Sequence, residues 1–184
     1  MKYLGKSVTL LKRGEVIAVR TDTVYGLLAD ATIDHAVQKV YELKKRHKDK
    51  ALIVLINSLE MAKNVANFTD ESMQYAHRVW TEEQKPVTLV LMAKNISRVV
   101  TGGGDTVALR LPHNTFCLEL IRQLDHPIVA PSANISGHPT AISADMVKAD
   151  FGNNLPLIID GGLCTNSPST IISFLDNKPI ILRK

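Results

Sequence analysis

The sequence predicts an α/β domain built on a mixed sheet in two or three layers. Short apolar runs typical of strands alternate with helical patterns along most of the chain. Some of these runs, such as residues 51–56, are apolar throughout, as in strands covered on both faces. Strand patterns crowd together toward residue 184 without helices between them, which indicates a mixed sheet.

The expected elements follow from apolar spacing and from polar residues that begin or end helices. A first helix is closed by basic residues and Gly14, and later helices follow the N-cap candidates Thr32, Ser58 and Thr69. The helix after Thr32 runs to about residue 45. Further helices are expected at residues 116–124 and 144–151. Strands are expected at residues 15–19, 51–56, 87–92, 107–111, 128–130, 157–159, 170–172 and 179–182, and a polar turn at residues 21–27.

Composition bounds the class of protein. The chain has 184 residues without repeats or linkers, so we expect one domain over residues 1–184. A net charge of +4 favours an anionic partner, either a nucleotide or a nucleic acid. The two cysteines, Cys117 and Cys164, make no disulfide framework and have no metal-ligand spacing, so no protein-ligated metal is expected. No signal peptide or membrane span is recognisable, so we expect a cytoplasmic protein without a membrane partner.

Three polar segments, each following an apolar run, are the candidate site. They are residues 21–27, the basic run of residues 44–50 and the hydroxyl- and amide-rich residues 131–137. In an open α/β sheet such loops gather at one edge and form a ligand crevice. No Walker loop or dinucleotide fingerprint is present, so phosphates would be held by side chains and loop amides. Taken singly, the basic run fits a solvated helix end and residues 131–137 fit an ordinary turn.

Taken together, these segments resemble the YrdC/Sua5 family. The resemblance rests on Thr-Asp-Thr-Val-Tyr-Gly-Leu at residues 21–27, Lys-Lys-Arg at 44–46 with Lys50, and Pro-Ser-Ala-Asn-Ile-Ser-Gly at 131–137. Shorter matching segments lie at residues 85–88, 107–112, 160–162, 168–170 and 181–183. The match covers nearly the whole chain in the family's order.

The resemblance implies a twisted, open mixed sheet flanked by helices, with a basic concave face. It implies a threonylcarbamoyl-AMP synthase of the short single-domain type, a nucleotidyltransferase that combines L-threonine, bicarbonate and ATP into threonylcarbamoyl adenylate and pyrophosphate. Mg²⁺ would arrive with ATP. The product would pass to a threonylcarbamoyl transferase complex that modifies tRNA.

The resemblance also assigns residues by motif position. The ATP-binding group would be Lys44, Arg46, Lys50, Thr88, Ser132, Asn134, Thr140 and Arg183. The threonine-binding group would be Thr23, Tyr25, Arg110, Ala130 and Ser169. Charge neutralisation and orientation should dominate catalysis by phosphoryl transfer, so we assign the catalytic role to Lys44 and Arg46 and name no general base.

Five departures from the family pattern fall near the site: Arg20, His47, Leu55, the pair Gln84-Lys85 and Asn166. Leu55 stands where long-type members carry a threonine-contacting histidine, which bears on amino-acid selectivity. Two alternative functions remain at this point. One is a module of the same fold that binds double-stranded RNA or tRNA, although an aromatic content of 5% offers few bases a stacking partner. The other is a relative that makes a different carbamoyl adenylate.

Overall fold

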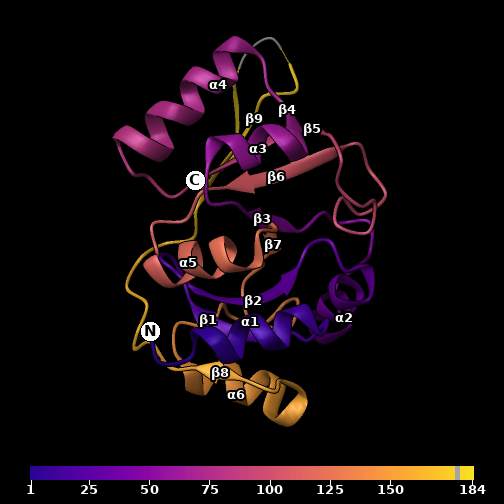
Figure 1. The fold of residues 1–184 in the computed structure, drawn as a ribbon, viewed down its shortest axis with the longest axis vertical. Coiled ribbons are helices and arrows are strands. Elements are labelled where there is room, and N and C mark those ends of the chain that lie inside the picture. Colours follow the sequence, from indigo (N-terminus) through magenta and orange to yellow (C-terminus); the bar gives the residue numbers. More distant parts are fainter. Residues whose placement is uncertain (177–178) are drawn as a thin grey trace.

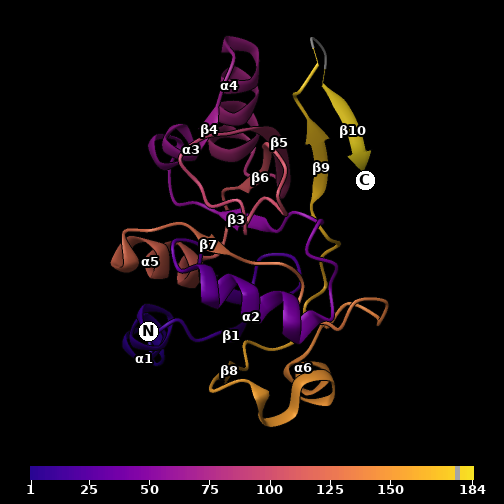
Figure 2. The same cartoon turned by 90° about the vertical axis from the view of Figure 1, so that its right-hand side faces the viewer.

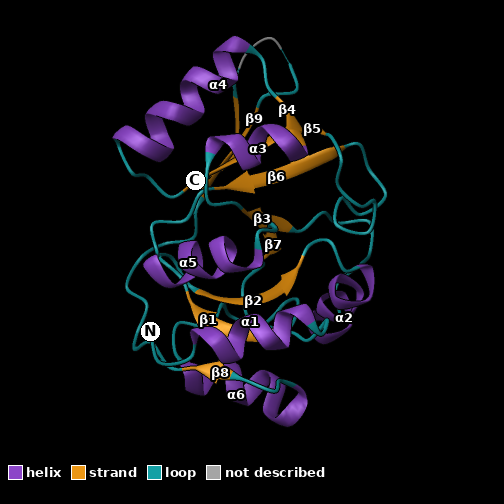
Figure 3. Cartoon of the chain, in the orientation of Figure 1, coloured by secondary structure: helices purple, strands orange, loops and turns teal. Residues whose placement is uncertain are grey.

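The computed structural model describes residues 1–176 and 179–184, and in these it confirms a mixed α/β fold (Figures 1 and 3). The helices are α1 (Leu4–Lys12), α2 (Asp34–Lys44), α3 (Leu59–Val65), α4 (Asp70–His77), α5 (Thr115–Leu124) and α6 (Ala144–Phe151), with the short helical turns η1 (Arg78–Glu82) and η2 (Gly152–Asn154). The strands are β1 (Ile17–Arg20), β2 (Tyr25–Asp30), β3 (Ile53–Leu55), β4 (Ala66–Asn67), β5 (Val87–Ala93), β6 (Thr106–Arg110), β7 (Ile128–Val129), β8 (Ile158–Ile159), β9 (Thr170–Ser173) and β10 (Ile180–Arg183).

The strands join in one open sheet. Their order is β10-β9-β5-β6-β3-β7-β2-β1-β8, with β4 attached to β5. The pairs β1–β8, β3–β6 and β5–β9 are parallel, whereas the other pairs are antiparallel. The expected mixed sheet is therefore confirmed. Because β8 and β9 lie far apart in this order, residues 160–169 cross the sheet between them.

The segment expected as a turn through residue 27 is in fact a hairpin. The turn ends at Val24, and β2 begins at Tyr25. Antiparallel pairing with β1 sets the register, in which Arg20 faces Tyr25 and Ile17 faces Leu28. The prediction of a longer turn was wrong because Tyr25 and Gly26 look like turn residues locally, whereas pairing with β1 on one side and the bridge from Gly26 to Ser132 on the other make this stretch part of an interior strand.

The expected cap of α2 was also wrong. The N-cap position is Ile33, and its side chain makes no capping hydrogen bond. Thr32 instead donates its hydroxyl to Asp30 Oδ1 at 2.6 Å, which closes the turn after β2. The caps expected at Ser58 and Thr69 are confirmed, since each side chain accepts a backbone N–H from the first turn of its helix. The strand β4 and the turns η1 and η2 had no counterpart in the sequence prediction.

Two apolar clusters cover opposite sides of the sheet's central strands. Alternate residues of β1 separate into them: Ile17 and Val19 pack with α1 and α5, while Ala18 packs in the cluster that contains residues of α2, α3, α4 and α6. Figure 2 shows α1 and α5 on one side of the molecule and the β9–β10 hairpin on the opposite side. In the described chain, none of the helices has the length and hydropathy needed to cross a bilayer.

Candidate functional site

Two adjoining cavities bring the three polar segments together. The small cavity is lined by Thr21, Thr23, Val24, Tyr25, Gly26, Ile53, Leu55, Arg110, Ala130, Ser132, Thr140, Pro168, Ser169 and Arg183. The basic cavity is lined by Lys44, Arg46, His47, Lys50, Ser132, Asn134, Ser136 and Gly137. Ser132 belongs to both. The basic run and the 131–137 loop therefore share one cavity, and Ser132 joins its lining to that of the cavity formed by the hairpin turn.

The residues expected at threonine and most of those expected at ATP line different cavities. All five residues expected at threonine line the small cavity. Of the residues expected at ATP, five line the basic cavity, namely Lys44, Arg46, Lys50, Ser132 and Asn134. Thr140 and Arg183 line the small cavity instead. Thr88 lines neither and is fully buried, and its hydroxyl is 2.8 Å from that of Ser169.

The hairpin turn presents its hydroxyl groups to the small cavity in a fixed arrangement. The Thr21 hydroxyl donates to the carbonyl of Val24 at 2.7 Å and accepts the backbone N–H of Thr23 at 3.1 Å. Both threonines are buried. These local bonds order the turn without a ligand, so it requires little rearrangement to bind one.

Arg110 at the end of β6 supplies one positive charge to the small cavity. Its Nη1 donates to Thr23 Oγ1 at 3.0 Å, and its Nη2 forms an ion pair with Asp22 Oδ1. The contact is ionic without the alignment of a hydrogen bond. Asp22 Oδ2 accepts the backbone N–H of His113 at 3.1 Å. Arg110 is thus held by the hairpin turn and balanced by a carboxylate that lies outside the cavity lining.

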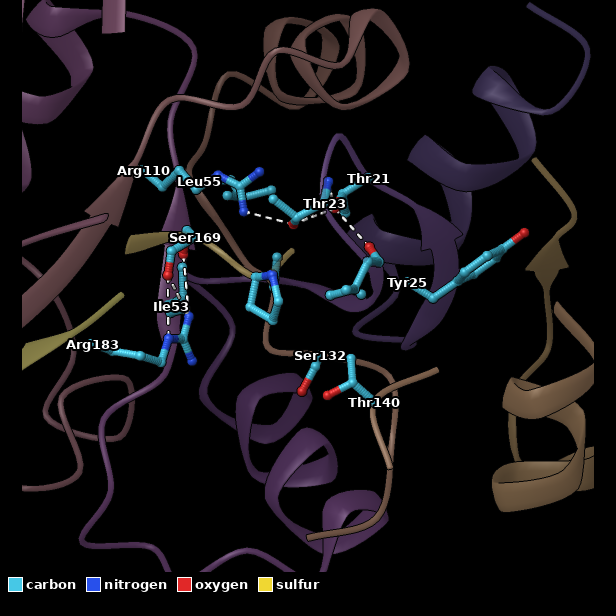
Figure 4. A pocket seen from close by; sticks show the side chains of 14 residues that line it. Thr21, Thr23, Tyr25, Ile53, Leu55, Arg110, Ser132, Thr140, Ser169 and Arg183 are labelled. Atoms are coloured by element: carbon cyan, nitrogen blue, oxygen red, sulfur yellow. Dashed lines mark hydrogen bonds between the residues drawn. The ribbon is translucent and has the colours of Figure 1, made fainter. Parts of the chain in front are cut away.

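Arg183 at the end of β10 supplies a second positive charge. Its Nε and Nη2 donate to the backbone oxygen of Ser169 at 3.2 and 2.8 Å. Figure 4 shows Arg110, Ser169 and Arg183 on one side of the cavity, with Ser132 and Thr140 apart from them. Burial and the charge of Arg110 lower the pKa of the Arg183 guanidinium.

Lys44 joins α2 to the 131–137 loop. Its ammonium donates to the backbone oxygens of Ser132 and Asn134, the second at 2.8 Å, and its own backbone oxygen accepts the N–H of Ser136 at 2.8 Å. Burial and the nearby charge of Arg46 lower the pKa of Lys44 to about 8. The side chain is therefore mostly an ammonium at pH 7, and it stabilises the loop.

The end of α2 sets the direction of the side chains in the basic run. Lys45 adopts the left-handed conformation with φ 48° and ψ 40°, which ends the helix. After this turn Arg46 Nη2 donates to the carbonyl of Ala51 at 3.0 Å. Lys44 and Arg46 consequently line the same cavity, although a continuous helix would separate their directions.

Tyr25 contributes its backbone, since its ring points away from the cavity (Figure 4). The phenol donates to the carbonyl of Gly162 at 2.9 Å and accepts the N–H of Gly161 at 3.1 Å. Burial raises the pKa of this phenol. Tyr25 therefore anchors the 160–169 segment where it begins to cross the sheet, and the structure places no ligand role on its hydroxyl.

Sequence reasoning missed three features of the site. Asp22 lies within a recognised motif, but nothing in the sequence indicates that Arg110 is its partner. Ile53 was not predicted in the site; it forms an aliphatic wall with Leu55, a residue already noted from the sequence, because alternate side chains of β3 point the same way. Pro168 joins the lining through the crossing segment. Strand periodicity signals the β3 pair, whereas the other two depend on tertiary placement.

A family model described as telomere recombination, for Sua5, YciO and YrdC proteins, matches residues 9–184. The chain belongs to the Sua5/YciO/YrdC family. The threonylcarbamoyl-AMP synthase of Pyrococcus abyssi is 41% identical over 176 residues, which are 94% of this chain and 51% of that protein. The threonylcarbamoyl-AMP synthase of Idiomarina loihiensis is 33% identical and is covered over 89% of both chains.

Solved structures of this family share the fold. P. abyssi Sua5 complexed with L-threonine superposes with a TM-score of 0.92 at 39% identity, over 98% of this chain and 53% of that chain. Escherichia coli YciO gives a TM-score of 0.86 at 20% identity, over 100% of this chain and 89% of that chain, a likeness that shows the fold alone. The chain spans about half the length of the P. abyssi relative.

Proposed function

We propose that this Sua5/YciO/YrdC protein is a threonylcarbamoyl-AMP synthase that converts L-threonine, bicarbonate and ATP into threonylcarbamoyl adenylate and pyrophosphate. The observation that carries the proposal is the pair of cavities that meet at Ser132. The small one offers hydroxyls, an aliphatic wall and arginine, which suit a small hydroxy amino acid. The basic one offers Lys and Arg to a polyphosphate. The names of the relatives agree with this assignment.

The reaction joins the two cavities. The threonine amine first takes up bicarbonate, so that a C–N bond forms and water leaves. A carbamate oxygen then attacks the α-phosphorus, the new P–O bond replaces the bridge to the β-phosphate, and pyrophosphate departs. Both reactants are anionic, so the protein's contribution is charge neutralisation and orientation. We assign Arg46 and Lys50 to the phosphates and assign Lys44 to holding the loop that carries Ser132.

Mg²⁺ belongs in this proposal as part of the nucleotide substrate. Across residues 1–176 and 179–184, no group of three or more His, Cys, Asp or Glu side chains is placed to hold a metal ion. A hard cation of this kind is commonly bound through substrate phosphates and water. We therefore propose that ATP brings the ion to the basic cavity.

Further partners are proposed on the same basis. Lys45, His47, Lys48 and Lys50 are exposed around the end of α2, where they favour contact with RNA phosphates. We propose tRNA as an RNA partner and a transferase complex as the acceptor of the adenylate, in the cytoplasm. We also propose that residues 1–184 are one domain, because strands from both ends of this range join one sheet. RNA binding that is insensitive to salt would contradict the phosphate-contact proposal.

The deciding assay measures pyrophosphate release from ATP, Mg²⁺ and bicarbonate, with L-threonine present or omitted. We expect release to require threonine. Arg46→Ala should lower turnover by about 10²–10³-fold, as for loss of one electrostatic contact to a transition state. The matched control is Arg122→Ala, which removes an exposed arginine that pairs on α5 with Glu119 and with no other carboxylate among the described residues. Threonine-independent release by the wild type would exclude this function.

A further inference from the structure

The small cavity contains two positive charges and no negative one. Among its lining residues, Arg110 and Arg183 alone are charged. The cavity volume is about 80 Å³, which is space for several waters or for one small polar molecule. A monoanionic amino acid needs only one of these arginines for its carboxylate.

The two arginines differ in how their charges are balanced. Arg110 is paired with the carboxylate of Asp22, and both side chains are nearly buried. Arg183 makes its protein contacts with the backbone and hydroxyl oxygens of Ser169, which are neutral. Within the described part of the chain, no carboxylate oxygen lies within 4.0 Å of the Arg183 guanidinium. The cavity therefore carries about one uncompensated positive charge.

The Arg183 guanidinium is also oriented before any ligand binds. Its Nε and Nη2 both donate to Ser169 O, and the Ser169 hydroxyl is held in turn by Thr88. No hydrogen bond of Nη1 occurs within the described residues, and Arg183 is exposed, so this nitrogen is open to water and can exchange that water for a ligand. A held guanidinium with a free edge suits a carboxylate-like anion.

We propose that Arg110 and Arg183 bind the two anionic groups of N-carboxy-L-threonine, with Arg110 on the α-carboxylate and Arg183 on the carbamate. This rests on the proposed function, because the dianion forms when threonine takes up bicarbonate. The family resemblance assigns Arg183 to ATP, whereas the structure places it in the lining of the small cavity with Thr23 and Arg110, and it does not line the basic cavity with Arg46 and Lys50. An anion between the arginines also offsets the repulsion from Arg110, which adds to the effect of burial in lowering the pKa of Arg183.

A binding experiment tests this without relying on turnover. N-oxalyl-L-threonine is a stable dianion that resembles the carbamate, and N-acetyl-L-threonine is a monoanion of similar shape. By calorimetry, we expect the wild-type protein to bind the oxalyl compound at least 10-fold more tightly, as for one charged hydrogen-bonded contact. In Arg183→Gln that preference should fall below about threefold. Equal affinities in the wild type, or a preference that survives in Arg183→Gln, would overturn the proposal.

Kinetics supply the second measurement. Arg183→Gln should lower kcat/KM for bicarbonate by about 10–100-fold, while the Kd for ATP alone changes less than threefold. A comparable loss of ATP affinity would assign Arg183 to the nucleotide. Arg183→Lys keeps the charge and should restore part of the bicarbonate dependence, and thermal unfolding shows whether each variant is folded. If the wild type releases no pyrophosphate but prefers the dianion, the proposed function fails and the two-arginine site stands.

Discussion

The buried ion pair between Asp22 and Arg110 provides the sharpest test of the structure. The substitution Asp22→Asn keeps the shape of the side chain and removes its charge. The two partner side chains are only 11% and 7% exposed, so Arg110 would retain a buried charge without a counterion. Breaking a buried pair in this way costs about 3–5 kcal/mol of unfolding free energy. For a chain of this length, that loss lowers Tm by about 10 °C.

The assay is urea denaturation, with an exposed pair as the matched control. Asp105 faces Arg98 at 3.7 Å, and these side chains are 77% and 74% exposed. Asp105→Asn should therefore change the unfolding free energy by less than about 1 kcal/mol. If Asp22→Asn costs no more than Asp105→Asn, the argument from burial is refuted.

A double substitution separates the pair's net contribution from the cost of leaving a charge alone. Replacing both partners, as Asp22→Leu with Arg110→Met, removes both desolvated charges together. We expect this variant to be more stable than Asp22→Asn, because desolvation of an ion pair offsets much of its attraction. Denaturation in parallel with the single variant checks the order, and the reverse order would contradict it.

Three further outcomes follow from backbone strain and burial. In urea denaturation, Gly102→Ala should lower the unfolding free energy by about 2 kcal/mol more than Gly103→Ala. Both glycines have a positive φ, but of the two only Gly102 would place an added Cβ 2.8 Å from the backbone of Asp49. Equal costs would refute this packing. Lys44→Met should lower the unfolding free energy by about 3 kcal/mol, since two loop carbonyls lose their donor; a change below 1 kcal/mol would contradict the loop-holding role. Burial raises the pKa of the Cys117 thiol to about 12. At pH 8, iodoacetamide should therefore alkylate Cys117 at least ~10²-fold more slowly in the folded protein than in the urea-unfolded chain, as followed by mass mapping. Similar rates in the two states would contradict this burial.

Local patterns sufficed for most elements of the fold. Apolar runs and N-cap residues located most strands and helices, because strand periodicity, helix periodicity and capping act between near neighbours in sequence. In the two errors near the site, a tertiary or neighbouring contact overrode the local sequence preference. Tyr25 begins a strand because it pairs with Arg20 of β1 and its neighbour Gly26 bridges to Ser132, and the Thr32 hydroxyl binds Asp30 where a helix cap was expected.

Motif order by itself determined the family and the three segments that form the site. Which side chains face which cavity was decided by the tertiary structure alone. Arg183 reaches the cavity through the pairing of β10 with β9, and Arg110 meets Thr23 across 87 residues of sequence. Tyr25 was also a candidate for the site from its motif, but its side chain points toward Gly162 and away from the cavity. Charge compensation and hydrogen bonding between distant segments depend on sheet order, and sheet order is set by long-range packing that no local pattern records.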